Sequence, residues 1–246
     1  MPDSLIVFVN VLAFALLPVA GTLGGSLLGE SVRAPRWLVG AALHGAAGIA
    51  IALVGIDLMP RLLQSLPMWA ILPAFLAGAG ASLLLARAMR ALRHRVGAAR
   101  GPALMVYVAV AADLASDGLM TGAGAAVAGS LGLLIGATQA VANIPGGFAA
   151  TKNLQDSGVP RPRRWLLAAG MALPALASAL AAFWLLRSGS GVLQETALAF
   201  IVGVLLLTTI EDIVPEGDRP EPPRWISTLA FALGFAGLGL ASAYLG

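Results

Sequence analysis

The sequence contains no cysteine and few charged residues. The lack of cysteine excludes disulfide bonds and thiolate metal ligands. Charged residues make up 11% of the 246 residues and hydrophobic residues 59%, a balance that soluble domains of this length do not show. The sequence therefore predicts an integral membrane protein of the all-α class.

Long apolar segments take up most of the chain. Most of them are close to the ~20 residues that a membrane-spanning helix needs. Eight can be marked, at about residues 5–28, 37–59, 68–86, 103–124, 127–151, 165–187, 192–213 and 225–245. They leave no room for a separate soluble domain, so residues 1–246 are expected to form a single transmembrane domain. The 30 glycines favour close packing between its helices.

The positions of the basic residues predict the orientation of the segments. Of the 15 Lys and Arg residues, only Arg61 and Arg187 follow even-numbered segments, and the remaining 13 follow odd-numbered ones. By the positive-inside rule, the loops after odd-numbered segments are cytosolic, and both termini lie outside the cell membrane. The net charge of +3 comes from these loops. It therefore fits contact with the lipid bilayer and does not indicate a nucleic-acid partner.

Two segments, 103–124 and 127–151, carry polar side chains inside apolar sequence. Asp113 and Asp117 are four residues apart, so on a helix they share one face about one turn apart. Gln139 and Asn143 have the same spacing. Such groups are costly in a bilayer, and their presence there indicates a function.

A residue that breaks regular helix structure follows each of these pairs. Gly118 comes directly after Asp117, and a Pro-Gly-Gly run comes soon after Asn143. The proline of that run, Pro145, cannot hydrogen-bond to the carbonyl of Val141. A freed carbonyl, an amide and two carboxylates facing one another would form an oxygen-rich cation site.

The two segments are joined by a short turn near Ala128, so we expect them to lie antiparallel and side by side. Counted from this turn, Asp113 and Asn143 lie at similar depth, and so do Asp117 and Gln139. No Lys or Arg lies in the core of any segment to neutralise the carboxylates. The sequence therefore predicts a functional intramembrane cation site at these four side chains.

Five further residues are candidates for the path of the cation. Asp57 and Met59 end the second segment, where Met59 is a candidate ligand and Asp57 could equally cap its helix. Glu211 and Asp212 end the seventh segment, where ordinary interfacial charge explains them equally well. His44 is 13 residues before Asp57, about 20 Å along a helix, so the two cannot bind one ion together. A hydrogen bond to a neighbouring helix is the alternative role for His44.

These motifs, in this order, resemble those of the ZIP (Zrt/Irt-like) family of divalent metal transporters. The similar stretches are Asp113-Leu114-Ala115-Ser116-Asp117-Gly118, Ala142-Asn143-Ile144-Pro145-Gly146-Gly147 and Glu211-Asp212-Ile213-Val214-Pro215-Glu216. The resemblance implies eight spans in a ZIP-like bundle, with a metal site between the fourth and fifth. It also implies an elevator-like motion, in which spans 1, 4, 5 and 6 slide against spans 2, 3, 7 and 8, and a homodimer.

The sequence departs from the family motifs at several ligand positions. Asp113 and Asp117 stand where the family has histidine and glutamate. Ala142 and Gly146 stand where it has the first ligand and the bridging glutamate of its second motif. Carboxylates and amides in place of imidazole favour harder cations such as Mn²⁺, Mg²⁺ or Ca²⁺. Exchange of a proton for the metal at the two like charges is a further hypothesis.

The sequence thus favours a permease that moves a divalent cation of the zinc, manganese or iron class into the cytosol. The ion would be its substrate, with no prosthetic group and no enzymatic activity. One alternative is a diverged relative that carries another solute or has lost metal transport, given Ala142 and Gly146. A second alternative is an intramembrane enzyme that uses Asp113 and Asp117 as an acid/base pair.

Overall fold

The computed structural model describes residues 2–32, 34–100 and 102–245, and these residues are helical almost throughout, with no β-strand among them. The predicted all-α class is confirmed. The elements are α1 (Pro2–Ser31), α2 (Arg36–Ala52), the π-helical segment η1 (Leu53–Leu58), α3 (Met59–Ser65), α4 (Met68–Arg100), α5 (Pro102–Val127), α6 (Gly129–Asp156), α7 (Arg161–Gly170), α8 (Ala172–Leu186), α9 (Gly191–Thr208), the π-helical segment η2 (Thr209–Ile213), α10 (Val214–Asp218) and α11 (Arg224–Leu245).

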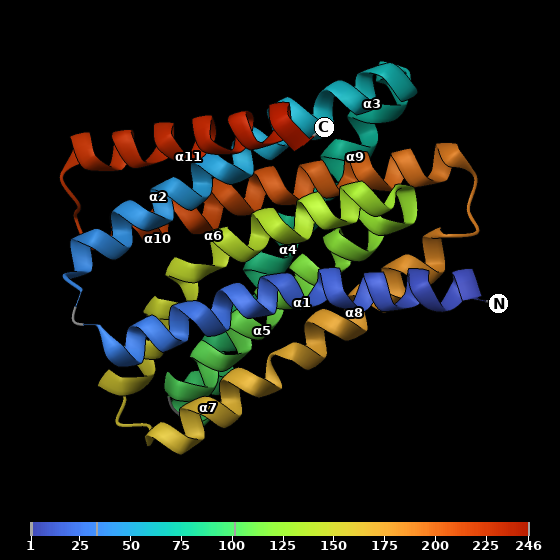
Figure 1. Ribbon diagram of the computed structural model, residues 1–246. Helices are drawn as coiled ribbons and strands as arrows, with labels where there is room; N and C mark the ends of the chain where they lie inside the picture. Colours follow the sequence, from blue (N-terminus) through green and yellow to red (C-terminus); the bar gives the residue numbers. More distant parts are fainter. Residues whose placement is uncertain (1, 33, 101, 246) are drawn as a thin grey trace. The chain divides into compact units, whose positions relative to one another are not determined.

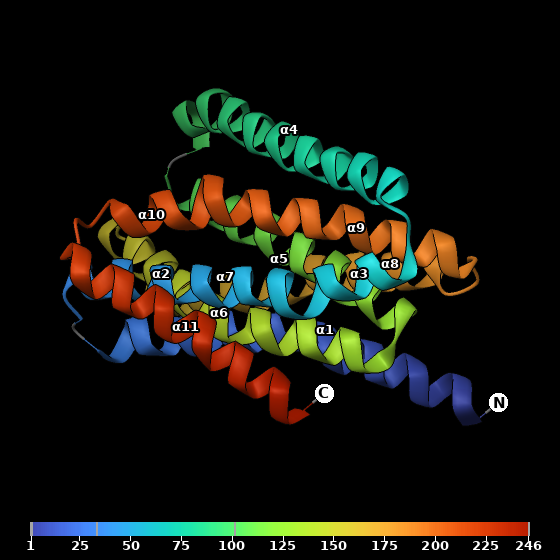
Figure 2. The same cartoon turned by 90° about the horizontal axis from the view of Figure 1, so that it is seen from above.

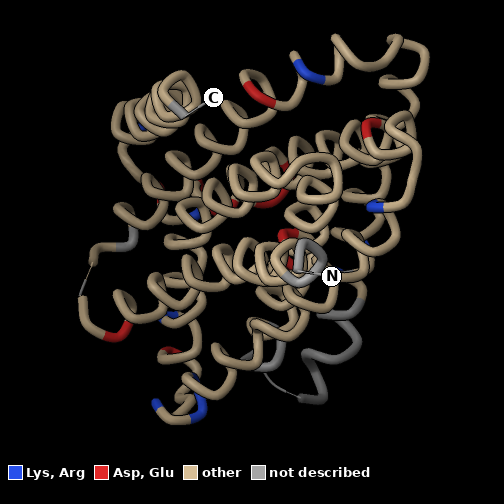
Figure 3. Tube along the Cα trace, turned by 45° about the vertical axis from the view of Figure 1, so that its right-hand side comes forward, with Lys and Arg blue, Asp and Glu red and all other residues tan. Residues whose placement is uncertain are grey.

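Helices suit this sequence because leucine and alanine are strong helix formers, and because a helix satisfies its backbone hydrogen bonds internally in an apolar setting. Within the described ranges, seven helical stretches are long and apolar enough to cross a membrane. They are Ile6–Ser31, Trp37–Ser65, Met68–Ala88, Gly129–Asp156, Arg161–Leu186, Gly191–Asp218 and Arg224–Tyr244. Figure 3 marks the few charged residues along the trace. By length and composition, these seven stretches are compatible with the predicted multi-pass membrane protein.

The predicted segment 103–124 corresponds to α5, a helix of 26 residues that is not among these seven. It carries Asp113 and Asp117 within an otherwise apolar sequence. Whether α5 crosses the membrane stays a prediction.

The helices group into two compact units, each built from two separate parts of the chain. Unit 1 comprises Met1–Arg33 and Ala86–Ser188, and unit 2 comprises Ala34–Leu85 and Gly189–Gly246. Unit 1 therefore contains α1 and α5 to α8, and unit 2 contains α2, α3, α9 to α11 and most of α4.

Close contacts at glycine hold unit 1 together. Helix α1 lies along α6, and α5 packs between α6 and α8 (Figures 1 and 2). A Cβ atom added at Gly21 or Gly25 of α1 would stand 1.9 or 2.0 Å from a backbone carbonyl oxygen of α6. On α5, Gly118 and Gly122 approach carbonyl oxygens of α8 in the same way, at 2.1 Å. Backbones that approach this closely bring short polar side chains of neighbouring helices within reach of one another.

In unit 2, α2 packs along α11, and an ion pair at 2.8 Å joins Arg61 of α3 to Glu195 of α9. Both π-helical segments end two residues before a proline, Pro60 in one case and Pro215 in the other. A proline has no N–H for the carbonyl four residues earlier, which accounts for the wider turn at these two places.

Candidate functional site

Helix α5 presents its two carboxylates differently. Asp117 is buried, with 6% of its surface exposed, whereas Asp113, one turn earlier, is exposed. The two lie near enough for their charges to repel each other. One carboxylate thus belongs to the interior of unit 1 and the other to its surface.

Helix α6 places Asn143 beside Asp117. The Nδ2 atom of Asn143 donates a hydrogen bond to Oδ2 of Asp117 at 2.6 Å and another to the carbonyl oxygen of Pro18 at 3.4 Å. The hydroxyl of Thr22 donates to the same carbonyl at 3.2 Å. Pro18 and Thr22 belong to α1, so three helices of unit 1 meet at one polar centre.

Gln139 lies in a second polar contact, one turn from the first. Its Oε1 atom accepts a hydrogen bond at 3.0 Å from Thr121, which is fully buried, and its Nε2 atom is 3.9 Å from the sulfur of Met120. Thr121 was not among the residues that the sequence singled out. Threonine at this spacing, four residues after Asp117, is the signal that could have identified it.

The pairing across α5 and α6 differs from the expectation. Equal counting from the turn matched Asp113 with Asn143 and Asp117 with Gln139. The structure instead joins Asp117 to Asn143 and Thr121 to Gln139, an offset of one helical turn. The physical reason lies at the turn. Ala128, the one residue between the two helices, is extended, so the helices leave the turn asymmetrically and equal counts do not give equal depth.

The positions at which the family motif would place further ligands hold small side chains. Ala142 is half-buried, and a Cβ atom built at Gly146 meets no atom within 4 Å. Among the side chains that the structure describes, no group of three or more His, Cys, Asp and Glu could hold a metal ion. A cation at the Asp117 centre would therefore rely on Asp113, Asp117, amide and carbonyl oxygens, and water.

The remaining sequence candidates belong to unit 2, so their relation to Asp117 stays a prediction. Asp57 lies in η1, where Ser242 donates to one of its carboxylate oxygens and the other is buried without a hydrogen bond. Met59 is the first residue of α3 and is half-buried. Glu211 and Asp212 are both exposed in η2.

His44 is held by groups of its own unit. Its Nδ1 atom donates to the carbonyl of Gly40 at 2.9 Å, and its Nε2 atom lies 3.2 Å from the carboxylate of Asp218 on α10. Its hydrogen bond thus stays within α2, and the contact with α10 is an ion pair only when the imidazole is protonated, so the role of His44 stays a prediction.

A polar cluster at the α7 end of unit 1 was not predicted from the sequence. In this cluster Glu30 of α1 pairs with Arg164. The four-residue spacing of Thr22, Ser26 and Glu30 in an otherwise apolar stretch is the signal that could have revealed it.

Comparison with known proteins does not identify this site. No protein-family model matches the chain, and no curated protein matches it at a significant level.

Proposed function

We propose that this chain is a multi-pass permease of the cell membrane that moves a divalent metal cation into the cytosol through the Asp117–Asn143 centre. The observation that carries the proposal is the meeting of a buried carboxylate, an amide and a backbone carbonyl from three apolar helices, with Asp113 one turn away. Intramembrane ionisable groups are expensive to retain, and cation pathways are a common reason for them.

The contacts suggest how a cation would bind. An ion approaching Oδ2 of Asp117 would replace the hydrogen bond from Asn143, and rotation of that amide would turn its oxygen toward the ion. The carbonyl of Pro18 lies against the same amide. Three such oxygens fall short of the six that Mn²⁺ or Mg²⁺ usually takes, so waters and Asp113 would complete the shell.

The ligand chemistry also suggests which ions would be carried. The centre offers oxygen atoms only, with no imidazole or thiolate among the residues placed there. Hard cations prefer such ligands. Within the zinc, manganese and iron class, we therefore expect manganese to be carried best.

The division into units supports a ZIP-like mechanism. Unit 1 comprises the first, fourth, fifth and sixth predicted spans, and unit 2 comprises the second, third, seventh and eighth. These are the two groups that the family resemblance assigns to the moving and static parts of an elevator. The proposal includes eight crossings, termini that both face outward, and a homodimer.

The test is uptake of Mn²⁺, Fe²⁺, Zn²⁺, Co²⁺ and Mg²⁺ into proteoliposomes by the native chain and by Asp117→Asn. The substitution keeps the shape of the side chain and removes its charge. We expect uptake by the native chain, strongest for Mn²⁺, and a loss of about 10- to 100-fold in the variant.

Glu221→Gln is the matched control, because it makes the same chemical change at an exposed loop residue. It should transport at the native rate. Equal uptake by native protein and Asp117→Asn, or no uptake of any ion by folded native protein, would reject the proposal.

One observation favours a second candidate. A Cβ atom added at Gly146, where the family has a glutamate, would meet no atom within 4 Å, so no neighbouring side chain fills the space beside it. A diverged relative that carries another solute would have this arrangement, and it would show no uptake of any of the five metals.

A further inference from the structure

A narrow cleft lies in unit 1 between α1, α6, α7 and the start of α8. Its polar lining comes from Thr22, Ser26 and Glu30 of α1, Thr151 of α6 and Arg164 of α7. Apart from Thr22, these residues play no part in the Asp117 centre described above.

The three α1 residues are spaced four apart and share one face of the helix. Thr22 and Ser26 are buried, and the side chain of Glu30 is only 8% exposed. The row begins at the Asp117 centre, because Thr22 and Asn143 both donate to the carbonyl of Pro18. From Pro18 to Glu30 is 12 residues, about 18 Å of helix, with an oxygen atom at each turn.

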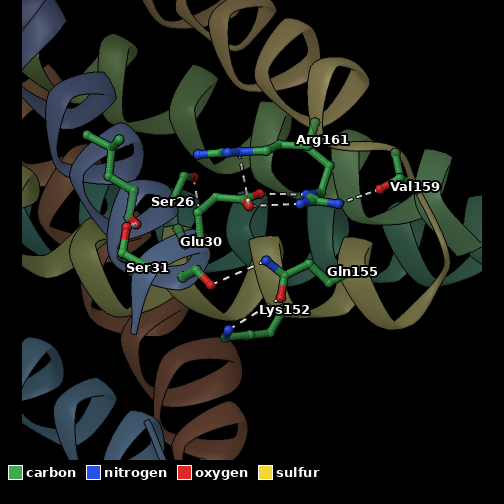
Figure 4. Close-up of polar contacts among 11 residues, drawn as sticks. Ser26, Glu30, Ser31, Lys152, Gln155, Val159 and Arg161 are labelled. Carbon is green, nitrogen blue, oxygen red and sulfur yellow. Dashed lines mark hydrogen bonds and ion pairs between the residues drawn. The ribbon is translucent and has the colours of Figure 1, made fainter. Parts of the chain in front are cut away.

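The row ends at an ion pair that occupies both oxygens of Glu30. Arg164 donates from Nε to Oε1 at 2.6 Å and from Nη2 to Oε2 at 2.8 Å. Its third nitrogen donates to the carbonyl of Val159, and Arg161 stands 3.7 Å from Oε2. Figure 4 shows Glu30 of α1 facing these guanidinium groups, with Ser26 beside it. Both Glu30 and Arg164 are largely buried, with 8% and 13% of their side chains exposed.

We propose that this cleft is a second cation site, in which Glu30 is the ligand carboxylate and Arg164 is a built-in competitor that takes the place of the ion. A divalent cation leaving Asp117 would pass the hydroxyls of Thr22 and Ser26 and displace Arg164 from Glu30 before it reaches the cytosol. The inference rests on the proposed function and names the exit of the same path.

The surroundings of the pair support this role. A buried ion pair contributes little net stability compared with apolar side chains of similar size, so stability alone is a weak reason for it. An interhelical clasp between α1 and α7 would need Glu30 and Arg164 only. The hydroxyls of Thr22 and Ser26 line the same cleft and donate to the carbonyl oxygens of Pro18 and Gly147, which leaves the lone pairs of both hydroxyl oxygens available to a cation.

The test counts Mn²⁺ ions bound per chain by the full-length purified protein, from the electron paramagnetic resonance signal of free Mn²⁺. Arg164→Gln removes the buried competitor and leaves Glu30 only the longer contact, at 3.7 Å, with the exposed side chain of Arg161. We expect one ion in the native protein and two in Arg164→Gln. The double variant Arg164→Gln, Glu30→Gln should return to one.

The double variant Asp117→Asn, Arg164→Gln separates this inference from the proposed function. It should keep one ion, bound at Glu30, whether or not the Asp117 centre binds metal. The inference is overturned if Arg164→Gln binds no more Mn²⁺ than the native chain, or if its extra ion survives Glu30→Gln.

Glu30→Gln alone provides a second measurement in case Arg164→Gln does not fold. It should lower Mn²⁺ uptake by about tenfold while Mn²⁺ binding at Asp117 is unchanged. Native uptake in a folded Glu30→Gln protein would also overturn the inference.

Arg164→Lys is the control for Arg164→Gln, because it keeps a positive charge beside Glu30. It should bind only the native number of ions.

Discussion

At the scale of single residues, the contact between Thr121 and Gln139 gives a clear test of the register between α5 and α6. Both side chains are buried, and the hydroxyl of Thr121 donates to the amide oxygen of Gln139 at 3.0 Å. In Thr121→Val this oxygen would be left without its donor inside the protein. We expect a loss of about 1–3 kcal/mol in the free energy of unfolding, measured in detergent micelles.

Two variants control this prediction. Thr121→Ser keeps the hydroxyl and should lose less stability than Thr121→Val. Thr196→Val removes an exposed hydroxyl that bonds only to its own helix, to the carbonyl of Val192, and should change stability little. If Thr121→Val and Thr196→Val unfold alike, the described register between α5 and α6 is wrong.

Asp117 and Asn143 could be singled out from the sequence, but their contact with each other and with Pro18 of α1 could not. Asp117 and Asn143 stand out because polar groups are rare in apolar segments. Which of them meet depends on how many residues the turn uses, and this is not visible in a count from Ala128. Glu30 and Arg164 are 134 residues apart, and only the packing of α7 against α1 brings them together.

At the scale of elements, neighbouring glycines on α1 provide a matched pair. A Cβ atom at Gly25 would stand 2.0 Å from the carbonyl oxygen of Ile144 on α6, whereas one at Gly24 would meet nothing within 4 Å. Gly25→Ala must therefore push α1 and α6 apart. We expect it to lower the free energy of unfolding by about 1–3 kcal/mol or more, because backbone atoms cannot rotate away.

Gly24→Ala is the control for this prediction, since it adds the same methyl group to the same helix. It should stabilise the protein by up to about 1 kcal/mol, because alanine loses less backbone entropy in a helix than glycine. Thermal unfolding in detergent compares the two variants directly. Similar melting temperatures would contradict the close approach of α1 and α6.

The predicted segments correspond to helices, but several helices continue past the apolar sequence. The predicted segment 68–86 belongs to α4, which continues to Arg100, and the segment 192–213 continues through η2 to the end of α10. Hydropathy marks where the apolar segment ends, whereas helical hydrogen bonding can continue past that point into polar sequence. The two π-helical segments could not be read from hydropathy, because a wider turn leaves the apolar pattern unchanged.

At the scale of the whole molecule, the residue pattern alone predicted a single transmembrane domain, and only the family resemblance implied a division of the spans into two groups. Each unit combines chain segments far apart in sequence, such as α1 with α5 to α8. Such grouping depends on where small residues allow backbones to approach. The glycines of α1 and α5 can be recognised as sites of close backbone approach only once their neighbours on α6 and α8 are known.

The crossing of α5 decides between seven and eight spans, and the absence of cysteine makes it easy to test. Ala91 and Ser130 are exposed residues on either side of α5. If α5 crosses the membrane, Ser130→Cys should react with a membrane-impermeant maleimide in intact cells, and Ala91→Cys should react only after permeabilisation. Ser188→Cys and Ser157→Cys flank the apolar stretch Arg161–Leu186 and should show the same contrast as a control.

Reaction of Ala91→Cys and Ser130→Cys from the same side would remove one crossing. The termini would then face opposite sides, and Asp113 and Asp117 would no longer lie on a membrane-spanning helix.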